Sequence, residues 1–201
     1  MAIKKLLFPF LYFLFFGVSA VAQKGLIIQG GGFISEKGGG FNAMAGLDFQ
    51  LDKYLYLRPQ IGLSEKKYLK FGAFPKSTGE TFSLYSNYLE FNLPVIGKLD
   101  FQKWRLLLIA GAAAGYAVRL EGRQLYIEDG LWVEEKFSLS RWNAEIFYGG
   151  GLELPVAEDN FITLSVTRHI GLCDINLSPG ADFYHQGLSI MMGLNLPFGK
   201  N

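Results

Sequence analysis

The chain has 201 residues, 50% of them hydrophobic, and a formal net charge of +1 at pH 7. A net charge so close to zero argues against binding to nucleic acids, whose partners usually carry a basic surface. Cys173 is the single cysteine, which excludes an intramolecular disulfide, and the sequence has no Cys/His cluster with the spacing of metal ligands. No metal and no cofactor are therefore predicted.

The N-terminal segment, residues 1–22, has the features of a secretory signal peptide. Lys4 and Lys5 precede an apolar run over residues 6–18, and small residues follow it up to Ala22. A membrane anchor is the alternative, but the run has about 13 residues and a spanning helix needs roughly 20. Cleavage after Ala22 would make Gln23 the first residue of the mature chain.

Residues 23–201 contain no Ser-, Pro- or charge-rich linker, so they are predicted to form one domain. Apolar and polar residues alternate along most of it with a period of two, which is typical of β-strands with one apolar face. In chain order, the predicted strands are residues 25–34, 41–51, 55–64, 89–101, 104–118, 141–156, 162–167 and 184–198.

Two prolines lie inside predicted strands. Pro59 and Pro94 predict local bulges, because proline donates no hydrogen bond to a ladder.

The clearest pair of strands is residues 89–101 and 104–118. Gln102 and Lys103 separate them, which predicts a β-hairpin. The apolar face of each strand continues for about a dozen residues, roughly the length that a tilted strand needs to cross a bilayer. Strands of soluble proteins usually have about half that length. These strands are therefore predicted to span a membrane.

The connections between the predicted strands alternate in length. Those after the second, fourth and sixth strands are short, and those after the first, third, fifth and seventh are longer. Outer-membrane barrels have this arrangement, with short periplasmic turns and long outer loops. A sandwich or lipocalin-like barrel is disfavoured because the polar residues are too sparse to cover an exterior. The sequence predicts an all-β protein, an eight-stranded antiparallel up-and-down transmembrane β-barrel with both termini in the periplasm of a Gram-negative bacterium.

A barrel of this size has a lumen only wide enough for side chains, so a diffusive pore is not expected. The charged residues on the inward parity include both signs, and buried charges must be paired. The predicted lumen charge network consists of Asp48, Arg58, Glu90, Lys98, Arg105, Arg141, Glu145 and Glu153.

Aromatic residues fall near both ends of the predicted strands, as expected for the two interfacial belts of a membrane barrel. At the short-turn end they are Phe49, Phe101, Trp104 and Phe198, and at the long-loop end they are Phe41, Tyr116, Trp142 and Tyr184.

Two segments carry a resemblance to a known family. The segment over residues 87–99, NYLEFNLPVIGKL, and the segment over residues 167–175, TRHIGLCDI, resemble strand motifs of the PorT-like outer-membrane β-barrels of Bacteroidetes. The chain departs from that pattern at His169, where the family usually has tyrosine. The resemblance implies a barrel, and within the family a few members are linked to protein secretion across the outer membrane.

The function predicted is that of a small monomeric outer-membrane barrel with a structural, surface-binding or secretion-accessory role. Its expected partners are outer-membrane lipids, lipopolysaccharide, and envelope or secretion-complex proteins that contact the long loops. The loop over residues 65–81 is basic, with Lys66, Lys67, Lys70 and Lys76, and the loop over residues 121–137 is acidic. Solvated loop charge is the simpler interpretation of both.

The alternative is a lipid-modifying barrel enzyme that acts on lipid A or phospholipid. Its candidate residues are His169, which is expected near the outer rim, and His185, Ser165 and Ser189. No spacing in the sequence ties a nucleophile to a base, so no catalytic residue is predicted and an enzyme is not expected.

Overall fold

The computed structural model of the chain describes residues 23–35, 38–71, 81–128, 131–136, 139–157, 160–173 and 184–197. The predicted signal peptide with its cleavage site after Ala22, and the predicted belt residue Phe198, lie outside these ranges. No helix in the described ranges is long and apolar enough to cross a membrane. The strands are β1 (Gln23–Ser35), β2 (Gly38–Gln50), β3 (Leu55–Leu57), β4 (Gln60–Phe71), β5 (Thr81–Phe101), β6 (Trp104–Glu128), β7 (Leu131–Lys136), β8 (Trp142–Ala157), β9 (Asn160–Gly171) and β10 (Gln186–Pro197).

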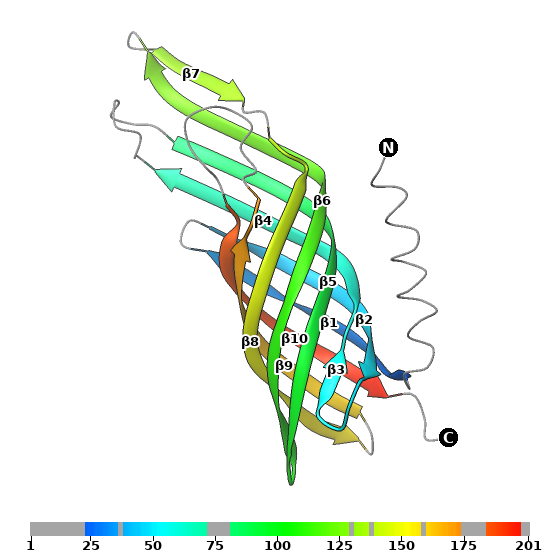
Figure 1. Cartoon of the computed structure of the whole chain (residues 1–201). Helices are drawn as coiled ribbons and strands as arrows, with labels where there is room; N and C mark the ends of the chain where they lie inside the picture. The colour runs from blue at the N-terminus through cyan, green and yellow to red at the C-terminus, as the bar shows by residue number, and fades with distance from the viewer. Residues whose placement is uncertain are drawn as a thin grey trace, which may run out of the picture.

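The strands form one antiparallel ring. The ladder between β1 and β10 joins the first strand to the last, and β3 and β4 together fill the place between β2 and β5. The ring runs β1, β2, β3/β4, β5, β6, β8, β9, β10 and back to β1, with β7 attached to β6 outside it. Figure 1 shows these strands tilted around a common axis. The predicted eight-stranded antiparallel barrel is confirmed.

Along each strand, side chains face alternately the lumen and the exterior of the barrel. On β6, Leu107 is 0% exposed whereas its neighbour Leu108 is 56% exposed, so the facing predicted for this strand is confirmed. Inside the barrel, Leu107 packs with Ile96 and Phe147 in an apolar cluster. Outside it, the walls present apolar side chains that fit the hydrocarbon of a bilayer.

Pro59 and Pro94 lie beside the same interruption of the sheet, between β3 and β4. Pro59 lies between β3 and β4, and on β5 the carbonyl of Pro94 accepts a hydrogen bond from the amide of Arg58 at 2.9 Å. In an antiparallel ladder, one residue directs its N–H and C=O groups at the same neighbouring strand. The backbone nitrogen of Pro94, which carries no hydrogen, therefore also faces this interruption. Because β5 stays in register with β6 through the Pro94–Gly111 pair, the bulge predicted at Pro94 is wrong.

Strands continue well beyond the ends predicted for them. The long connections predicted over residues 65–81 and 121–137 are largely wrong, because β4 runs to Phe71, β6 runs to Glu128, and β7 pairs with β6. The register between β5 and β6 shifts between Asn87 and Tyr88 and leaves Val118 of β6 without a cross-strand partner. Beyond Val118 the odd-numbered residues of β6 face outward, whereas the parity of β5 does not change. We call the extension the projecting sheet, and it comprises residues 66–71 of β4, 81–87 of β5, 119–128 of β6 and 131–136 of β7. Figure 1 shows β6 and β7 reaching beyond the rest of the barrel.

Candidate functional site

The lumen holds a first ion-pair cluster toward the short-turn end, formed by Asp48, Arg58, Lys98 and Glu153. The Arg58 guanidinium donates to Asp48 Oδ2 at 2.9 Å and contacts Glu153 at 3.3 Å. Lys98 Nζ lies 2.8 Å from Asp48 and 3.1 Å from Glu153. All four side chains are buried, so two cations and two carboxylates neutralise one another where water is excluded. We call this group the turn-side cluster.

A second cluster lies toward the long-loop end and contains Lys66, Glu90, Glu145 and His169. Lys66 Nζ lies 3.0 Å from Glu90 and also bonds to Glu145. His169 Nδ1 lies 2.9 Å from Glu145 Oε2, and Ser64 Oγ donates to Glu90 at 2.6 Å. We call this group the loop-side cluster.

Two of these positions correct the sequence predictions. The sequence predicts Lys66 in a basic loop, yet β4 continues through it and places its side chain inside the barrel at 1% exposure. His169 is predicted near the outer rim, but it is a buried residue of the lumen. Both predictions are wrong because the strands continue past the ends that the sequence pattern indicates.

The structure brings seven of the eight residues predicted for the lumen network into ion pairs, divided between the two clusters. Arg105 lies at the rim, where its side chain is 33% exposed and contacts Asp100 at 2.7 Å and Glu153 at 3.6 Å. Arg141 does not belong to the network. It precedes the start of β8, and its side chain is exposed.

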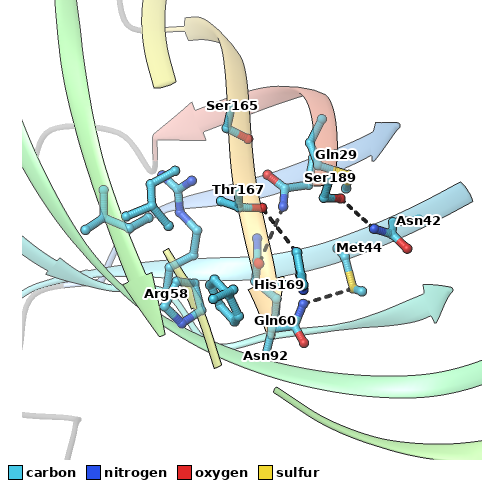
Figure 2. A pocket seen from close by; sticks show the side chains of 15 residues that line it. Gln29, Asn42, Met44, Arg58, Gln60, Asn92, Ser165, Thr167, His169 and Ser189 are labelled. Atoms are coloured by element: carbon cyan, nitrogen blue, oxygen red, sulfur yellow. Dashed lines mark hydrogen bonds between the residues drawn. The ribbon is translucent and has the colours of Figure 1, made fainter. Parts of the chain in front are cut away.

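A cavity of about 40 Å³ lies between the two clusters and has room for about three water molecules. Figure 2 shows Arg58 on one side of it and His169 and Thr167 among the other lining residues. Three buried polar atoms of lining residues have no hydrogen-bond partner among the described residues, namely Asn42 Oδ1, Gln60 Nε2 and Asn92 Oδ1. The cavity is thus a polar space suited to small molecules rather than to an acyl chain or a sugar.

The candidate enzyme residues are only partly assembled. His169, Ser165 and Ser189 line the cavity, but the hydroxyl that His169 Nε2 contacts is that of Thr167, at 3.1 Å. Ser189 Oγ instead accepts from Asn42 Nδ2 at 2.7 Å. Glu145, His169 and Thr167 therefore form a carboxylate–imidazole–hydroxyl chain that sequence spacing did not reveal.

His185 lies apart from that chain and closes the lumen at the long-loop end. Its Nδ1 lies 2.7 Å from the hydroxyl of Tyr68 and its Nε2 lies 2.8 Å from that of Tyr88. Next to it, Phe33, Tyr68 and Leu84 form a buried apolar cluster. The side chain therefore ties the start of β10 to β4 and β5 across the mouth of the barrel.

The predicted belt aromatics that the structure describes lie on the outer surface. At the short-turn end, Phe101 stacks on Trp104 with ring centroids 4.5 Å apart. At the long-loop end, Tyr116 and Trp142 pack edge to face with centroids 5.1 Å apart. Phe41, Phe49 and Tyr184 are also exposed or half-buried at their strand ends.

Beyond the long-loop belt, the ribbon formed by β6 and β7 exposes large apolar side chains. Trp132 is 64% exposed, and Leu125 and Ile127 on the same face are also exposed; Leu131, which is 71% exposed, lies on the other face. Contiguous exposed apolar groups on a protein surface commonly mark an interaction site. The patch of Leu125, Ile127 and Trp132 lies on the part of β6 and β7 that extends beyond the belt residue Tyr116.

No protein-family model matches the chain, and no curated protein matches it. Among solved structures, a major outer membrane protein from Thermus thermophilus is similar with a TM-score of 0.60 and 14% identity, over 88% of this chain and 100% of that one. Neisserial surface protein A gives a TM-score of 0.48 and 12% identity, over 88% and 97% of the two chains. Ail of Yersinia pestis gives 0.39 and 12%, over 88% and 97%.

Identities this low concern the fold alone, and the similarity to the Thermus thermophilus protein, with a TM-score of 0.60, supports it. The ring of antiparallel strands is closed, and its exterior is apolar between two aromatic ends. In a bilayer such a ring leaves no backbone group unpaired in lipid. The chain has the fold of the outer-membrane β-barrels, and its exterior is suited to that membrane.

Proposed function

We propose that this protein is a monomeric, non-conducting barrel that binds a macromolecule at the cell surface through its projecting sheet. The observation on which the proposal rests is the exposed apolar patch of Leu125, Ile127 and Trp132 on one face of the ribbon. Folded proteins rarely leave such groups in water without a use for them. The patch stands beyond the aromatic belt, so lipid tails do not cover it.

The interior of the barrel is filled by side chains, which supports a functional role for the outer surface rather than the lumen. The turn-side cluster, the apolar cluster around Leu107 and the loop-side cluster fill successive levels, and His185 closes the mouth. The cavity between the clusters has a volume of about 40 Å³, which is far below that of usual ligand sites at roughly 300 Å³ or more. Purified protein in planar bilayers is expected to show no steady ion conductance.

The outer edge of β7 adds a second feature for binding. Among the described strands β7 pairs only with β6, so its other edge presents backbone donors and acceptors that a strand of a partner could pair with. Glu134 and Lys136 on β7 are exposed and would favour a partner segment with complementary charges. An envelope or secretion-complex protein is such a partner, in line with the resemblance to PorT-like barrels.

Shortening the ribbon tests this function. Arg123 and Lys136 are cross-strand partners, so an Asn-Gly turn can replace residues 124–135 without breaking the ladder below. The variant is expected to insert and to show the usual heat-dependent migration in SDS gels, yet to fail in complementing a deletion strain. Full complementation by the inserted variant would exclude the ribbon as the functional surface.

A photo-crosslinking amino acid then locates the partner. Placed at Trp132, it is expected to give adducts in whole cells. The matched control at Lys103, an exposed residue of the β5–β6 turn, should give none. Equal adducts at both positions would indicate contact without specificity.

The Glu145–His169–Thr167 chain is the observation that favours the alternative, a lipid-modifying enzyme. The imidazole of His169, as a base, lies within hydrogen-bond distance of the hydroxyl of Thr167, as a nucleophile, and Glu145 contacts its other ring nitrogen. A lipid ester would nevertheless have to enter a lumen with little free space. If the enzyme hypothesis is correct, lipid A or phospholipid mass spectra will differ between strains with the wild-type protein and with Thr167→Val. Identical spectra are expected from the binding function.

A further inference from the structure

A row of outward-facing side chains marks the outer border of the apolar belt on the β4–β5–β6–β8 side. Leu63 pairs with Leu89, Leu89 with Tyr116, and Tyr116 with Trp142. All four are exposed on the outside of the barrel. We call this the border row. In a membrane its aromatic end lies at the level of the lipid headgroups.

Two rows of charged residues follow directly beyond the border row. Glu65 pairs with Asn87, and Asn87 with Arg119. In the next row Lys67 pairs with Tyr85, and Tyr85 with Glu121. The register shift at Asn87 turns the odd-numbered residues of β6 outward, so these side chains continue the lipid-facing surface rather than the lumen.

Basic groups outnumber acidic groups on this face. We call the face the basic strip. Its cations are Lys67, Arg119, Arg123 and Lys136, and its acids are Glu65, Glu121 and Glu134.

The ion pairs within the strip leave its cations available. Arg119 lies 2.9 Å from Glu121, and Arg123 lies 3.6 Å from the same carboxylate, but these side chains are 59% and 50% exposed. Exposed pairs of this kind are weak. They orient the guanidinium groups and leave donors free for an incoming anion.

An aromatic residue is built into the strip. The ring of Tyr85 has Lys67 Nζ at 5.2 Å and Arg119 Cζ at 5.0 Å from its centroid, and its hydroxyl donates to Glu65 at 2.8 Å. Tyr116 and Trp142 lie one row below. Flat aromatic faces beside cations suit a ligand with both sugar rings and phosphates.

The strip ends at β2 and β1. On β2, Glu65 pairs with Phe41, and the next outward-facing residue of β1 is Ile34. These side chains are 49% and 54% exposed and apolar. Farther round the ring, Arg168 of β9 is an outward-facing cation that pairs with Leu188, so the described outward cations gather mainly, but not entirely, on the β4–β7 side.

We infer that the basic strip binds the phosphate groups of a phosphorylated glycolipid of the lipid A type in the outer leaflet. Arginine side chains bind phosphate through two parallel charge-assisted hydrogen bonds, and lysine adds a point charge. The strip faces sideways just beyond the apolar belt, which is where such headgroups lie when their acyl chains pack against Leu63 and Leu89. A soluble phosphate would not gain from this position, whereas a membrane lipid would.

The test compares lipids and variants in one binding measurement. Full-length protein in detergent is titrated with bisphosphorylated lipid A, and bound lipid is counted by native mass spectrometry. The same lipid without its phosphates is expected to bind about tenfold more weakly or worse, and so is the variant Lys67→Gln/Arg119→Gln/Arg123→Gln. The matched control Lys53→Gln/Lys103→Gln changes exposed lysines of the short-turn end and should bind as the wild type does.

Two further measurements separate the possible outcomes. Inorganic phosphate at millimolar concentration should not displace the lipid, because the site requires a membrane-anchored ligand; displacement would indicate a free phosphate site and overturn the proposal. Equal binding of both lipids, or by the triple variant, would overturn it as well. The ribbon-shortened variant keeps the four cations and should bind the lipid normally, so this inference and the proposed macromolecular binding can fail separately.

Discussion

Lys66 of β4 and Glu145 of β8 form an ion pair across the lumen, whereas the next residue along β4, Lys67, points outward and contacts Glu65 at 2.8 Å. Lys66 also holds Glu90, so Lys66→Met would leave two buried carboxylates short of a cation. We expect a loss of about 3–5 kcal/mol in the free energy of unfolding. The measurement is urea unfolding in detergent, followed by the heat-dependent gel shift.

The adjacent Lys67 provides the control for that experiment. Its side chain is 54% exposed, and exposed ion pairs contribute roughly 0–1 kcal/mol. Lys67→Met should therefore change the free energy of unfolding by less than about 1 kcal/mol. Similar losses for both variants would contradict the alternating faces of β4 beyond Glu65.

The position of the bilayer can be tested on β6 and β7. Leu108 lies in the middle of the spanning part of β6 and faces outward, so Leu108→Arg is expected to destabilise the barrel in lipid by roughly 2–4 kcal/mol. Leu131 is even more exposed but lies on the ribbon, and Leu131→Arg should cost almost nothing. A comparable cost at Leu131 would mean that the ribbon lies in the membrane.

His185 predicts a dependence of stability on pH. Burial, with a smaller contribution from the charge of Lys66, lowers the pKa of His185 to about 3, whereas the unfolded chain has an ordinary pKa of about 6.5. The folded state therefore favours the neutral ring, so this stabilisation is complete above about pH 7 and is lost progressively as the pH falls toward 3. Between pH 7 and pH 5 the loss should be about 2 kcal/mol.

The variant His185→Gln isolates that contribution. It lacks the titrating ring, so its stability should fall less between pH 7 and pH 5 than that of the wild type, whatever its absolute stability. Unfolding midpoints at the two pH values provide the comparison. Parallel pH profiles would show that the ring does not remain neutral in the folded protein.

The polar atoms of the cavity give a last prediction. Asn92 Oδ1 has no partner among the described residues, and the amide nitrogen of Asn92 reaches only Met44 Sδ at 3.8 Å. A leucine of similar size would remove an unsatisfied group, so Asn92→Leu should be neutral or stabilising within about 1 kcal/mol. Glu90→Leu, two residues away on the same face, should destabilise because it removes a bonded partner of Lys66. Thermal unfolding of both variants checks the contrast.

Much of the fold follows from the sequence because the membrane imposes a simple pattern. Over residues 89–101 and 104–118, one parity meets lipid and the other meets the lumen, so a period of two also shows the facing of each residue. The inward residues are not all polar, because Leu107 is buried inside the barrel. The structure explains it through packing with Ile96 and Phe147.

The loop-side cluster was only partly predictable because its contacts join distant strands. Lys66 and Glu145 are 79 residues apart in the chain, and Arg58 and Glu153 of the turn-side cluster are 95 apart. Periodicity places each residue on a face but does not set its height in the barrel. Height depends on the register between strands, which is altered by the shift between Asn87 and Tyr88.

The length of β6 sets how far from the membrane a partner can be held. The strand has 25 residues, whereas a bilayer requires about 9–11. Its ten residues from Arg119 to Glu128 extend over about 33 Å along the chain axis at roughly 3.3 Å per residue. Because the rows of Arg119 and Glu121 lie next to the headgroups, the part of the extension that can meet a large neighbouring protein or another cell is the far end of the ribbon, which carries Ile127 and Trp132.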